Sequence, residues 1–376
     1  MRIFFVTNNY IPYSGGVVQS ITATAQELRT QGHEVFIITL DFLGSQHNDL
    51  DYIIRIACPI KFRYKKNYMA IPWRPTHAIK KLIEQYKPDV IHVHHPFLLG
   101  TRAVHAARTY NIPCVFTHHT LYEEYAHYIP VPSIFIRPLI RTAVRIFCNK
   151  VQAIIAPSSY VKNYLQSQNI KTPIFVIPSP LRECFTNINN KKEKKDAHFF
   201  ELLLVTRFVP EKNVPFVFGV MNLLPDNFRI TLAGYGNDEE KLQTLAFDTL
   251  QFSPERVCFV HKPNQEQLLE LYRTADLFIF PSTTDTQGIV LAESMSQGLP
   301  VIALDGPGQR DIIENGENGF ITTNAQKTAE IIIKISADKK LHNHLVNGTR
   351  KTAQHYSTKV IIQKLLQLYN SITDHR

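Results

Sequence analysis

No run of 18 consecutive apolar residues occurs in this sequence of 376 residues, so no segment predicts a membrane-spanning helix. The apolar stretch that follows Met1 is too short for a secretory signal peptide. The five cysteines are widely spaced, odd in number and without a C-x-x-C pair, which argues against a disulfide framework. We therefore expect free thiols in a reducing compartment and a cytoplasmic protein.

The sequence also has no low-complexity tract and no internal repeat. Its length exceeds what one hydrophobic core usually supports, which predicts two domains. Charge is unevenly divided between them. Residues 1–190 carry 20 Lys and Arg against 10 Asp and Glu, whereas residues 191–376 carry 21 against 22. The basic first half indicates an anionic surface partner for one domain.

Short β-rich runs alternate with helical segments over residues 1–180, and this alternation predicts a parallel, doubly wound α/β sheet. The expected strands are Arg2–Thr7, Glu34–Leu40, Asp89–Val93, Cys114–Thr117, Lys150–Ala156 and Ile174–Ile177. The expected helices between them are Val17–Gln31, Ile79–Tyr86 and Val104–Tyr110.

The polar stretch Asn187–Asp196 has no hydrophobic period and predicts a linker. Strands are expected again at Glu201–Val205, Arg229–Ala233, Val257–Phe259, Leu277–Phe280 and Val301–Ala303, with helices at Val214–Leu223, Glu239–Phe247, Gln265–Thr274 and Ile289–Gln297. We expect an N-terminal Rossmann-like domain over 1–183, a second one over 184–357, and a last helix within 358–376 that crosses back onto the first. Two such sheets that face each other would leave a ligand cleft at the carboxyl ends of their strands.

The stretch PSTTDTQGIVLAESMSQGLP, residues 281–300, predicts a strand end, a loop and a helix that begins at Gly288. Unpaired N–H groups of Gly288, Ile289 and Val290 would then offer a site for phosphate oxygens. Asp285 and Glu293 flank this turn and could bracket a bound ligand. Taken alone, the two acids could equally be a loop acid and a solvated helical glutamate.

Cations and glycines follow other expected strands. Arg207 and Lys212 come after the strand ELLLV and could clamp the phosphates of a sugar nucleotide, or simply be surface charges. Gly15, Gly16 and Gly234 follow strands as well, and glycine lets the backbone approach a ligand closely. Glycine pairs are also common in ordinary turns.

Histidines are concentrated after two strands, at positions 92, 94, 95, 118, 119 and 127. An H-x-H pair on a strand places two imidazoles on one face, as a metal site would. No carboxylate or thiolate spacing supports such a site, and His92 and His94 lie in an apolar strand. We therefore expect no metal.

Two segments of the first half combine cations with apolar side chains. Ile134–Cys148 predicts an amphipathic helix in which Arg137, Arg141 and Arg145 form one stripe, and Lys61–Arg74 interleaves cations with aromatics. Such segments are typical of interfacial membrane contact, although the arginines could be the solvated face of a core helix. No nucleic-acid-binding module is visible.

Six segments together resemble GT-B fold, retaining glycosyltransferases of family 4, and among these the bacterial diacylglycerol glucosyltransferases and related lipid glycosyltransferases. They are PYSGGVVQSI, DVIHVHHP, THHTLYEEYAHYI, TRFVPEKN, AGYGN and TDTQGIVLAESMSQGLPVI, and they occur in the family's order between residues 12 and 302.

The resemblance implies transfer of a hexose, glucose from UDP-glucose, to a membrane lipid hydroxyl such as that of diacylglycerol, with an α linkage and without a metal. It implies that Arg207 and Lys212 neutralise the leaving diphosphate, that the Gly15–Gly16 loop covers the donor phosphates, and that Glu293 binds the ribose. His119 would lie beside the donor sugar, and residues 122–125 would border the acceptor. Asp285 replaces the first glutamate of the family's E-x7-E motif, as it does in lipid-glycosylating relatives.

Other functions remain open at this point. The same donor site could serve a soluble, polyprenyl-linked or protein acceptor. An epimerase or hydrolase of sugar nucleotides could share the fold, and a non-catalytic binding protein would need a broken donor site. The enzyme would work at the inner face of the cell membrane if the basic segments bind anionic lipid.

Overall fold

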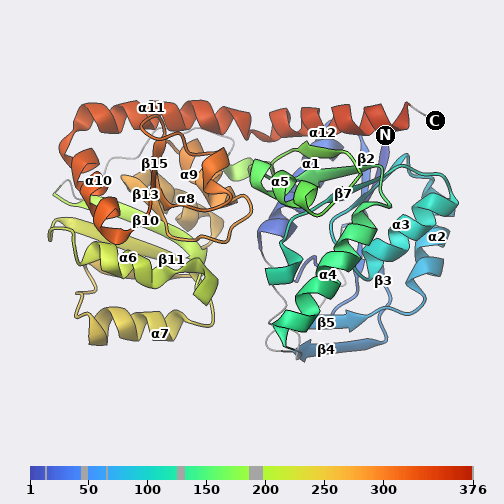
Figure 1. Cartoon of the computed structure of the whole chain (residues 1–376), viewed down its shortest axis with the longest axis horizontal. Coiled ribbons are helices and arrows are strands. Elements are labelled where there is room, and N and C mark those ends of the chain that lie inside the picture. Colours follow the sequence, from blue (N-terminus) through green and yellow to red (C-terminus); the bar gives the residue numbers. More distant parts are fainter. Residues whose placement is uncertain (13–14, 44–49, 65–66, 125–131, 186–197, 375–376) are drawn as a thin grey trace. The chain divides into compact units, whose positions relative to one another are not determined.

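The computed structural model describes residues 1–12, 15–43, 50–64, 67–124, 132–185 and 198–374. The chain divides into two compact units (Figure 1). Unit 1 comprises Met1–Pro180 together with Thr358–Arg376, and unit 2 comprises Leu181–Ser357. The expected linker Asn187–Asp196 lies outside the described residues.

Unit 1 is built on a parallel sheet of order β3-β2-β1-β6-β7-β8-β9. Its strands are β1 (Arg2–Val6), β2 (Glu34–Leu40), β3 (Ile53–Ile56), β6 (Val90–Val93), β7 (Cys114–Thr117), β8 (Ala153–Ala156) and β9 (Ile174–Val176). Ile3, Phe4, Phe5 and Val6 of β1 are all fully buried. Continuous apolar strands of this kind need cover on both faces, which the helices provide.

Helices cover both faces of the first sheet, and their bounds are α1 (Gly16–Thr30), α2 (Pro75–Tyr86), α3 (Leu99–Thr109), α4 (Ser133–Cys148), α5 (Ser159–Ser167) and α12 (Thr358–Thr373). α1 and α12 pack on one face, where Ile361 and Leu365 meet the core of β1. α2, α3, α4 and α5 pack on the other face. The last helix therefore belongs to the core of unit 1 (Figure 1).

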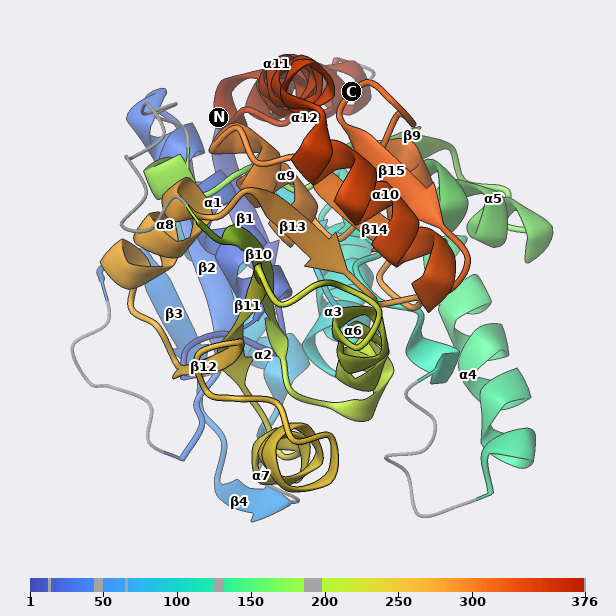
Figure 2. The same ribbon diagram turned by 90° about the vertical axis from the view of Figure 1, so that its left-hand side faces the viewer.

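Unit 2 repeats the plan with the order β12-β11-β10-β13-β14-β15. Its strands are β10 (Phe200–Arg207), β11 (Phe228–Tyr235), β12 (Val257–His261), β13 (Leu277–Phe280), β14 (Val301–Leu304) and β15 (Gly319–Thr322). Its helices are α6 (Val214–Met221), α7 (Glu239–Thr244), α8 (Gln265–Thr274), α9 (Ile289–Ser296), α10 (Ala325–Ala337) and α11 (Lys339–His355). Figure 2 shows α8 and α9 on one side of this sheet and α6 and α10 on the other.

Strand order reverses once in each sheet. In unit 1 the reversal lies between β1 and β6, and in unit 2 it lies between β10 and β13. Loops leave the carboxyl ends of two such strands in opposite directions and open a crevice there, which is where open α/β sheets bind ligands. The topology thus predicts ligand-binding residues in the loops after β1, β6, β10 and β13.

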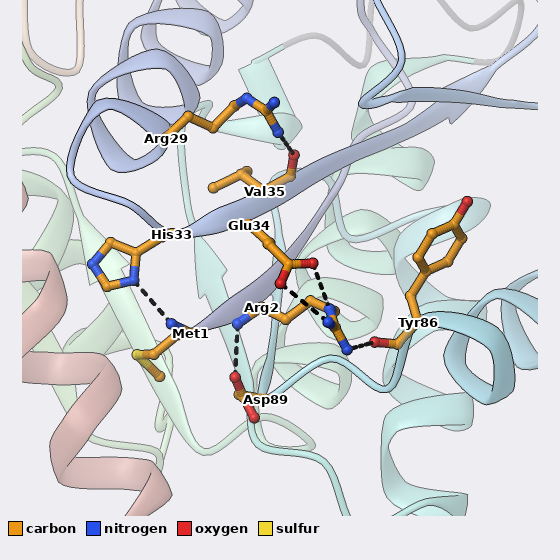
Figure 3. Close-up of polar contacts among 8 residues, drawn as sticks. All are labelled: Met1, Arg2, Arg29, His33, Glu34, Val35, Tyr86 and Asp89. Atoms are coloured by element: carbon orange, nitrogen blue, oxygen red, sulfur yellow. Dashed lines mark hydrogen bonds and ion pairs between the residues drawn. The ribbon is translucent and has the colours of Figure 1, made fainter.

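At the opposite end of the first sheet, where its strands begin, polar contacts surround Arg2 (Figure 3). Its guanidinium donates to both carboxylate oxygens of Glu34, at 2.9 and 3.1 Å, and to the carbonyl oxygen of Tyr86. The Arg2 backbone N–H donates to Asp89 Oδ2 at 2.7 Å. Hydrogen bonding to Arg2 lowers the pKa of Glu34. These contacts tie the starts of β1, β2 and β6 together and hold their register.

The structure confirms two parallel-sheet α/β domains, and it adds elements that the sequence pattern did not predict. These are the strands β3 and β15, the helices α5, α10 and α11, and an antiparallel hairpin of β4 (Ile60–Tyr64) and β5 (Asn67–Ile71). Among the described residues, no helix is both long and apolar enough to cross a bilayer.

Candidate functional site

An ion pair joins the two loops at the strand reversal of unit 2. Lys212, which follows β10, places its Nζ 2.6 Å from Oδ1 of Asp285, which follows β13. Both side chains are largely buried, with 15% and 22% of their surface exposed. Asp285 Oδ2 is buried and has no hydrogen-bond partner among the described residues. The structure thus brings together two of the residues that the sequence singled out.

Backbone and side-chain hydrogen bonds hold these two loops in place. Asn213 Nδ2 donates to the carbonyl oxygen of Pro281 at 3.3 Å, and Ser282 Oγ donates to that of Glu211 at 3.4 Å. The loop after β14 adds a third support, because Gly308 N–H donates to the Asp285 carbonyl oxygen at 3.0 Å. A Cβ at Gly308 would lie 2.6–2.8 Å from Gln287 backbone atoms. This glycine keeps the β14 loop against Asp285, and the sequence analysis did not identify it.

Arg207 is the last residue of β10 and remains about half exposed. Its Nη2 lies 3.9 Å from Glu211 Oε1, which is a loose contact. The carboxyl end of β10 therefore carries one tightly paired cation, Lys212, and one exposed cation. Together with their carboxylate partners, Asp285 and Glu211, they form a charged rim at the strand reversal.

α9 begins beside this rim. Gly288 caps the helix with φ +65°, the left-handed region that glycine adopts at little cost, and its carbonyl oxygen accepts from Leu291 N–H at 2.9 Å. The N–H groups of the first turn, including those of Ile289 and Val290, point out of the helix start. At Gly234, the other glycine predicted in this unit, glycine is required for a different reason. A Cβ there would lie only 1.8 Å from the Thr206 carbonyl oxygen.

Glu293 of α9 is buried with 1% of its surface exposed. Arg182 donates to its Oε1 from Nε at 2.9 Å and from Nη2 at 2.8 Å, and Tyr272 OH donates to Oε2 at 3.4 Å. Burial raises the pKa of Glu293, and the charge of Arg182 opposes that rise. Asp285 and Glu293 thus contact different cations. Arg182 and Tyr272 were missed because nothing in their sequence spacing connects them with α9.

In unit 1 the strand reversal lies beside polar residues after β1, β6 and β7. Asn8 donates from Nδ2 toward His95 Nδ1 at 2.7 Å and accepts Leu99 N–H at 3.1 Å. His119, two residues beyond β7, is partly exposed and has its Nε2 3.0 Å from Nδ1 of His94. Burial by surrounding side chains lowers the pKa of His119 to about 3.

The glycines at the start of α1 stand in open surroundings. Among the described residues, no atom lies within 4 Å of a Cβ built at Gly15 or Gly16. Packing therefore does not require glycine at position 16, in contrast to position 234. The adjoining residues 13–14 lie outside the described part of the chain.

Two elements of unit 1, α4 and the hairpin of β4 and β5, carry large apolar side chains that are exposed to solvent. In α4, Ile134 and Phe135 are 73% and 69% exposed, whereas Val144 and Phe147 pack into the core. The start of the helix therefore presents apolar side chains to solvent, whereas its end contributes side chains to the core.

The hairpin presents a second apolar face. Ile60 pairs with Ile71 and Phe62 with Met69, and all four side chains are exposed. Lys61 points to the other face, where its Nζ lies 2.5 Å from Asp41 Oδ2. Of the predicted basic stripe on α4, Arg141 binds Glu123 at 2.7 Å and Arg137 contacts Glu124 at 3.4 Å. Lys65, Lys66 and Tyr125 lie outside the described residues.

Comparison with known proteins assigns the chain to a family. Residues 14–181 match the family described as Glycosyltransferase Family 4, and residues 185–352 match Glycosyl transferases group 1. The chain is 30% identical over 367 residues to the alpha-monoglucosyldiacylglycerol synthase of Streptococcus pneumoniae, covering 92% of this chain and 81% of that protein. This chain belongs to glycosyltransferase family 4. It is an enzyme that transfers hexosyl groups.

Two further proteins extend the comparison. The alpha-monoglucosyldiacylglycerol synthase of Acholeplasma laidlawii is 24% identical over 396 residues, covering 100% of this chain and 98% of that protein. Anabaena HepE, solved in complex with UDP-glucose, superposes with a TM-score of 0.75 at 18% identity and covers 99% of this chain and 100% of its own. The family 4 glycosyltransferase therefore has the GT-B fold that the sequence motifs predicted.

Proposed function

We propose that this glycosyltransferase moves glucose from UDP-glucose to the hydroxyl group of a membrane lipid such as diacylglycerol, with retention of configuration, to form an α-glycolipid. Two relatives that align with most of the chain are named as alpha-monoglucosyldiacylglycerol synthases, and a protein of the same fold binds UDP-glucose. The observation that carries the proposal is the presence of two cations, Arg207 and Lys212, at the β10–β13 reversal, where they can bind the oxygens of a diphosphate.

In the proposed reaction the bond between the anomeric carbon and the diphosphate oxygen breaks, and a bond from that carbon to the lipid oxygen forms on the same face. The proton of the lipid hydroxyl passes to an oxygen of the leaving diphosphate. Arg207, Lys212 and the first N–H groups of α9 neutralise the negative charge that develops on this diphosphate, so they stabilise the transition state. No covalent intermediate and no metal ion are required.

Other residues take supporting roles in this proposal. The neutral imidazole of His119 contacts the donor sugar, and Glu293, held by Arg182, accepts hydrogen bonds from the ribose. The Gly15–Gly16 turn contacts the donor phosphates through its backbone, which its open surroundings permit. Asp285 positions Lys212 and contacts the sugar.

The acceptor proposal rests on the surface of unit 1. The hairpin and the first half of α4 each present large exposed apolar side chains, which are typical of interaction surfaces. The excess of cations in the first half of the chain favours an anionic lipid surface as the partner. We propose that unit 1 binds the inner face of the cell membrane reversibly and takes its lipid acceptor there.

Transfer of radiolabelled glucose from UDP-glucose into lipid tests this function. Label is expected in the organic phase only when the vesicles contain the acceptor lipid, diacylglycerol. Label on a soluble, polyprenyl-linked or protein acceptor instead would discard the lipid acceptor, and release of free glucose without any acceptor would indicate a hydrolase.

Replacing Ile134 and Phe135 by serine is expected to weaken binding to anionic vesicles. Each exposed side chain that enters a bilayer contributes about 1.5–3 kcal/mol, so each loss lowers the partition coefficient roughly tenfold or more. Co-sedimentation with phosphatidylglycerol vesicles measures this. Ile333→Ser on α10 of unit 2 is the matched control, because Ile333 is also exposed. Equal vesicle binding by the double variant and the control would show that α4 does not bind the membrane.

A further inference from the structure

Three imidazoles lie in a row beside the strand reversal of unit 1. The rings of His92 and His94 stack with centroids 4.2 Å apart and an angle of 28° between them. The rings of His94 and His119 follow at 5.3 Å and 23°. His92 and His94 share one face because side chains two residues apart on an extended chain point the same way. Only the last ring of the row, His119, is partly exposed.

The first ring of the row is fixed at both nitrogens. His92 Nδ1 lies 2.5 Å from the hydroxyl of Tyr369 on α12, and its Nε2 lies 2.6 Å from Thr117 Oγ1. Both partners are hydroxyl groups, which can donate or accept. A neutral His92 is therefore satisfied on both sides, and its ring is a rigid plane against which His94 packs.

The middle ring has one partner only. His94 Nδ1 faces Nε2 of His119 at 3.0 Å, while His94 Nε2 is buried and has no hydrogen-bond partner among the described residues. Burial lowers the pKa of His94 and, to about 3, that of His119, so both rings are neutral near pH 7. Each ring therefore carries a single N–H.

Only one proton arrangement avoids a buried donor without an acceptor. A proton on His94 Nε2 would be such a donor, and buried N–H groups left unpaired are rarer in proteins than unpaired acceptors. A proton on His94 Nδ1 instead donates to His119 Nε2 and leaves only a lone pair unpaired. Since His119 Nε2 then accepts, the proton of His119 must be on Nδ1.

We propose that His94 is a positioning residue that holds His119 in the Nδ1–H tautomer, so that His119 presents a hydrogen-bond donor to the oxygen of the sugar or diphosphate it contacts. This inference rests on the proposed role of His119 in sugar transfer. The tautomer itself follows from contacts within unit 1. The stacked ring of His92, itself held by Tyr369 of α12 and by Thr117, supports His94 from the other side.

Nuclear magnetic resonance of isotope-labelled imidazole nitrogens tests the tautomer without any substrate. The signals of His119 are identified by their loss in His119→Ala. In the unaltered protein we expect a protonated Nδ1 and a bare Nε2. In His94→Leu the hydrogen bond to Nε2 is gone, and the His119 signals are expected to shift toward the other tautomer. A protonated Nε2 in the unaltered protein would overturn the proposal, whatever the activity.

Kinetics on His94→Leu and His94→Asn separate positioning from packing. The two side chains have similar size, but only the asparagine amide can place an N–H near the Nδ1 position. We expect His94→Leu to lower kcat by about 10- to 100-fold with little change in KM for the donor, and His94→Asn to stay within roughly threefold of the parent. Equal losses in both variants, with equal falls in Tm, would mean that His94 is only a packing residue.

His119→Ala tests the role of His119 in sugar transfer separately from its tautomer. Full activity of that variant would remove His119 from the proposed reaction, while the tautomer measured by magnetic resonance would still stand or fall on its own. Loss of activity in His119→Ala, together with the Nδ1–H signal and the leucine–asparagine difference at position 94, is the combined result that we expect.

Discussion

Lys212→Ala is expected to lower turnover by about 10²–10³-fold, the usual cost of removing one preorganised group that stabilises developing negative charge. Lys212 Nζ lies at the β10–β13 strand reversal, 2.6 Å from Asp285. In our account this cation moves its interaction to the leaving diphosphate as the glycosidic bond breaks. Because the interaction strengthens in the transition state, the loss is expected in kcat and in kcat/KM together.

Steady-state glucose transfer and a thermal melt, measured on the same preparation, check this result. Lys327→Ala is the matched control, because Lys327 forms an exposed ion pair with Glu330 in the same unit, at 3.4 Å. The control should retain activity and Tm. Near-normal turnover of Lys212→Ala would remove Lys212 from the phosphate site.

Arg182→Met is expected to destabilise the protein by about 3–5 kcal/mol at pH 8, because it leaves the carboxylate of Glu293 buried without its cation. Methionine preserves the packing of the side chain over Phe185, where the guanidinium now lies 4.7 Å from the ring centroid. Without Arg182, the pKa of Glu293, already raised by burial, rises further.

The loss should depend on pH with a definite sign. A carboxyl group whose folded-state pKa is raised binds more protons folded than unfolded, so its contribution to stability falls as the pH rises through the folded-state pKa. The deficit of Arg182→Met relative to the parent is therefore expected to be full at pH 8 and to shrink as the pH falls toward the unfolded-state pKa of Glu293. Urea unfolding at several pH values measures it.

A control separates this effect from the loss of any arginine. Arg310 pairs with Asp305 at 2.6 Å on the surface of the same unit, with 69% of the arginine side chain exposed. Arg310→Met should leave the urea midpoint nearly unchanged. A deficit of Arg182→Met that stays constant between pH 5 and pH 8 would mean that Glu293 is not the source of the destabilisation.

The fold could be predicted from local patterns because each buried strand is a short apolar run bounded by loops. Leu277–Phe280 and Cys114–Thr117 have the bounds that the sequence indicated. The hairpin of β4 and β5 was not predicted. Its exposed apolar residues are interleaved with cations, so the segment was interpreted as a basic surface rather than as two strands. The helices α10 and α11 were not predicted.

Much less of the site could be predicted, because its contacts join residues far apart in the sequence. The sequence predicted that Lys212 follows a strand. Its pairing with Asp285, 73 residues away, could not be predicted because it depends on β10 lying beside β13. The contact of Arg182 with Glu293 spans 111 residues. Asn8 could have been found, since it lies two residues beyond β1 at the strand reversal, where ligand-binding loops are expected.

We propose that this enzyme transfers glucose to a lipid with retention of configuration. The most direct test is the anomeric configuration of the glycolipid formed from UDP-glucose on vesicles that contain diacylglycerol, read from the proton magnetic resonance spectrum of the first product. Our account predicts the small anomeric coupling of an α-glucoside. A β-glucoside, or free glucose without any lipid product, would contradict it.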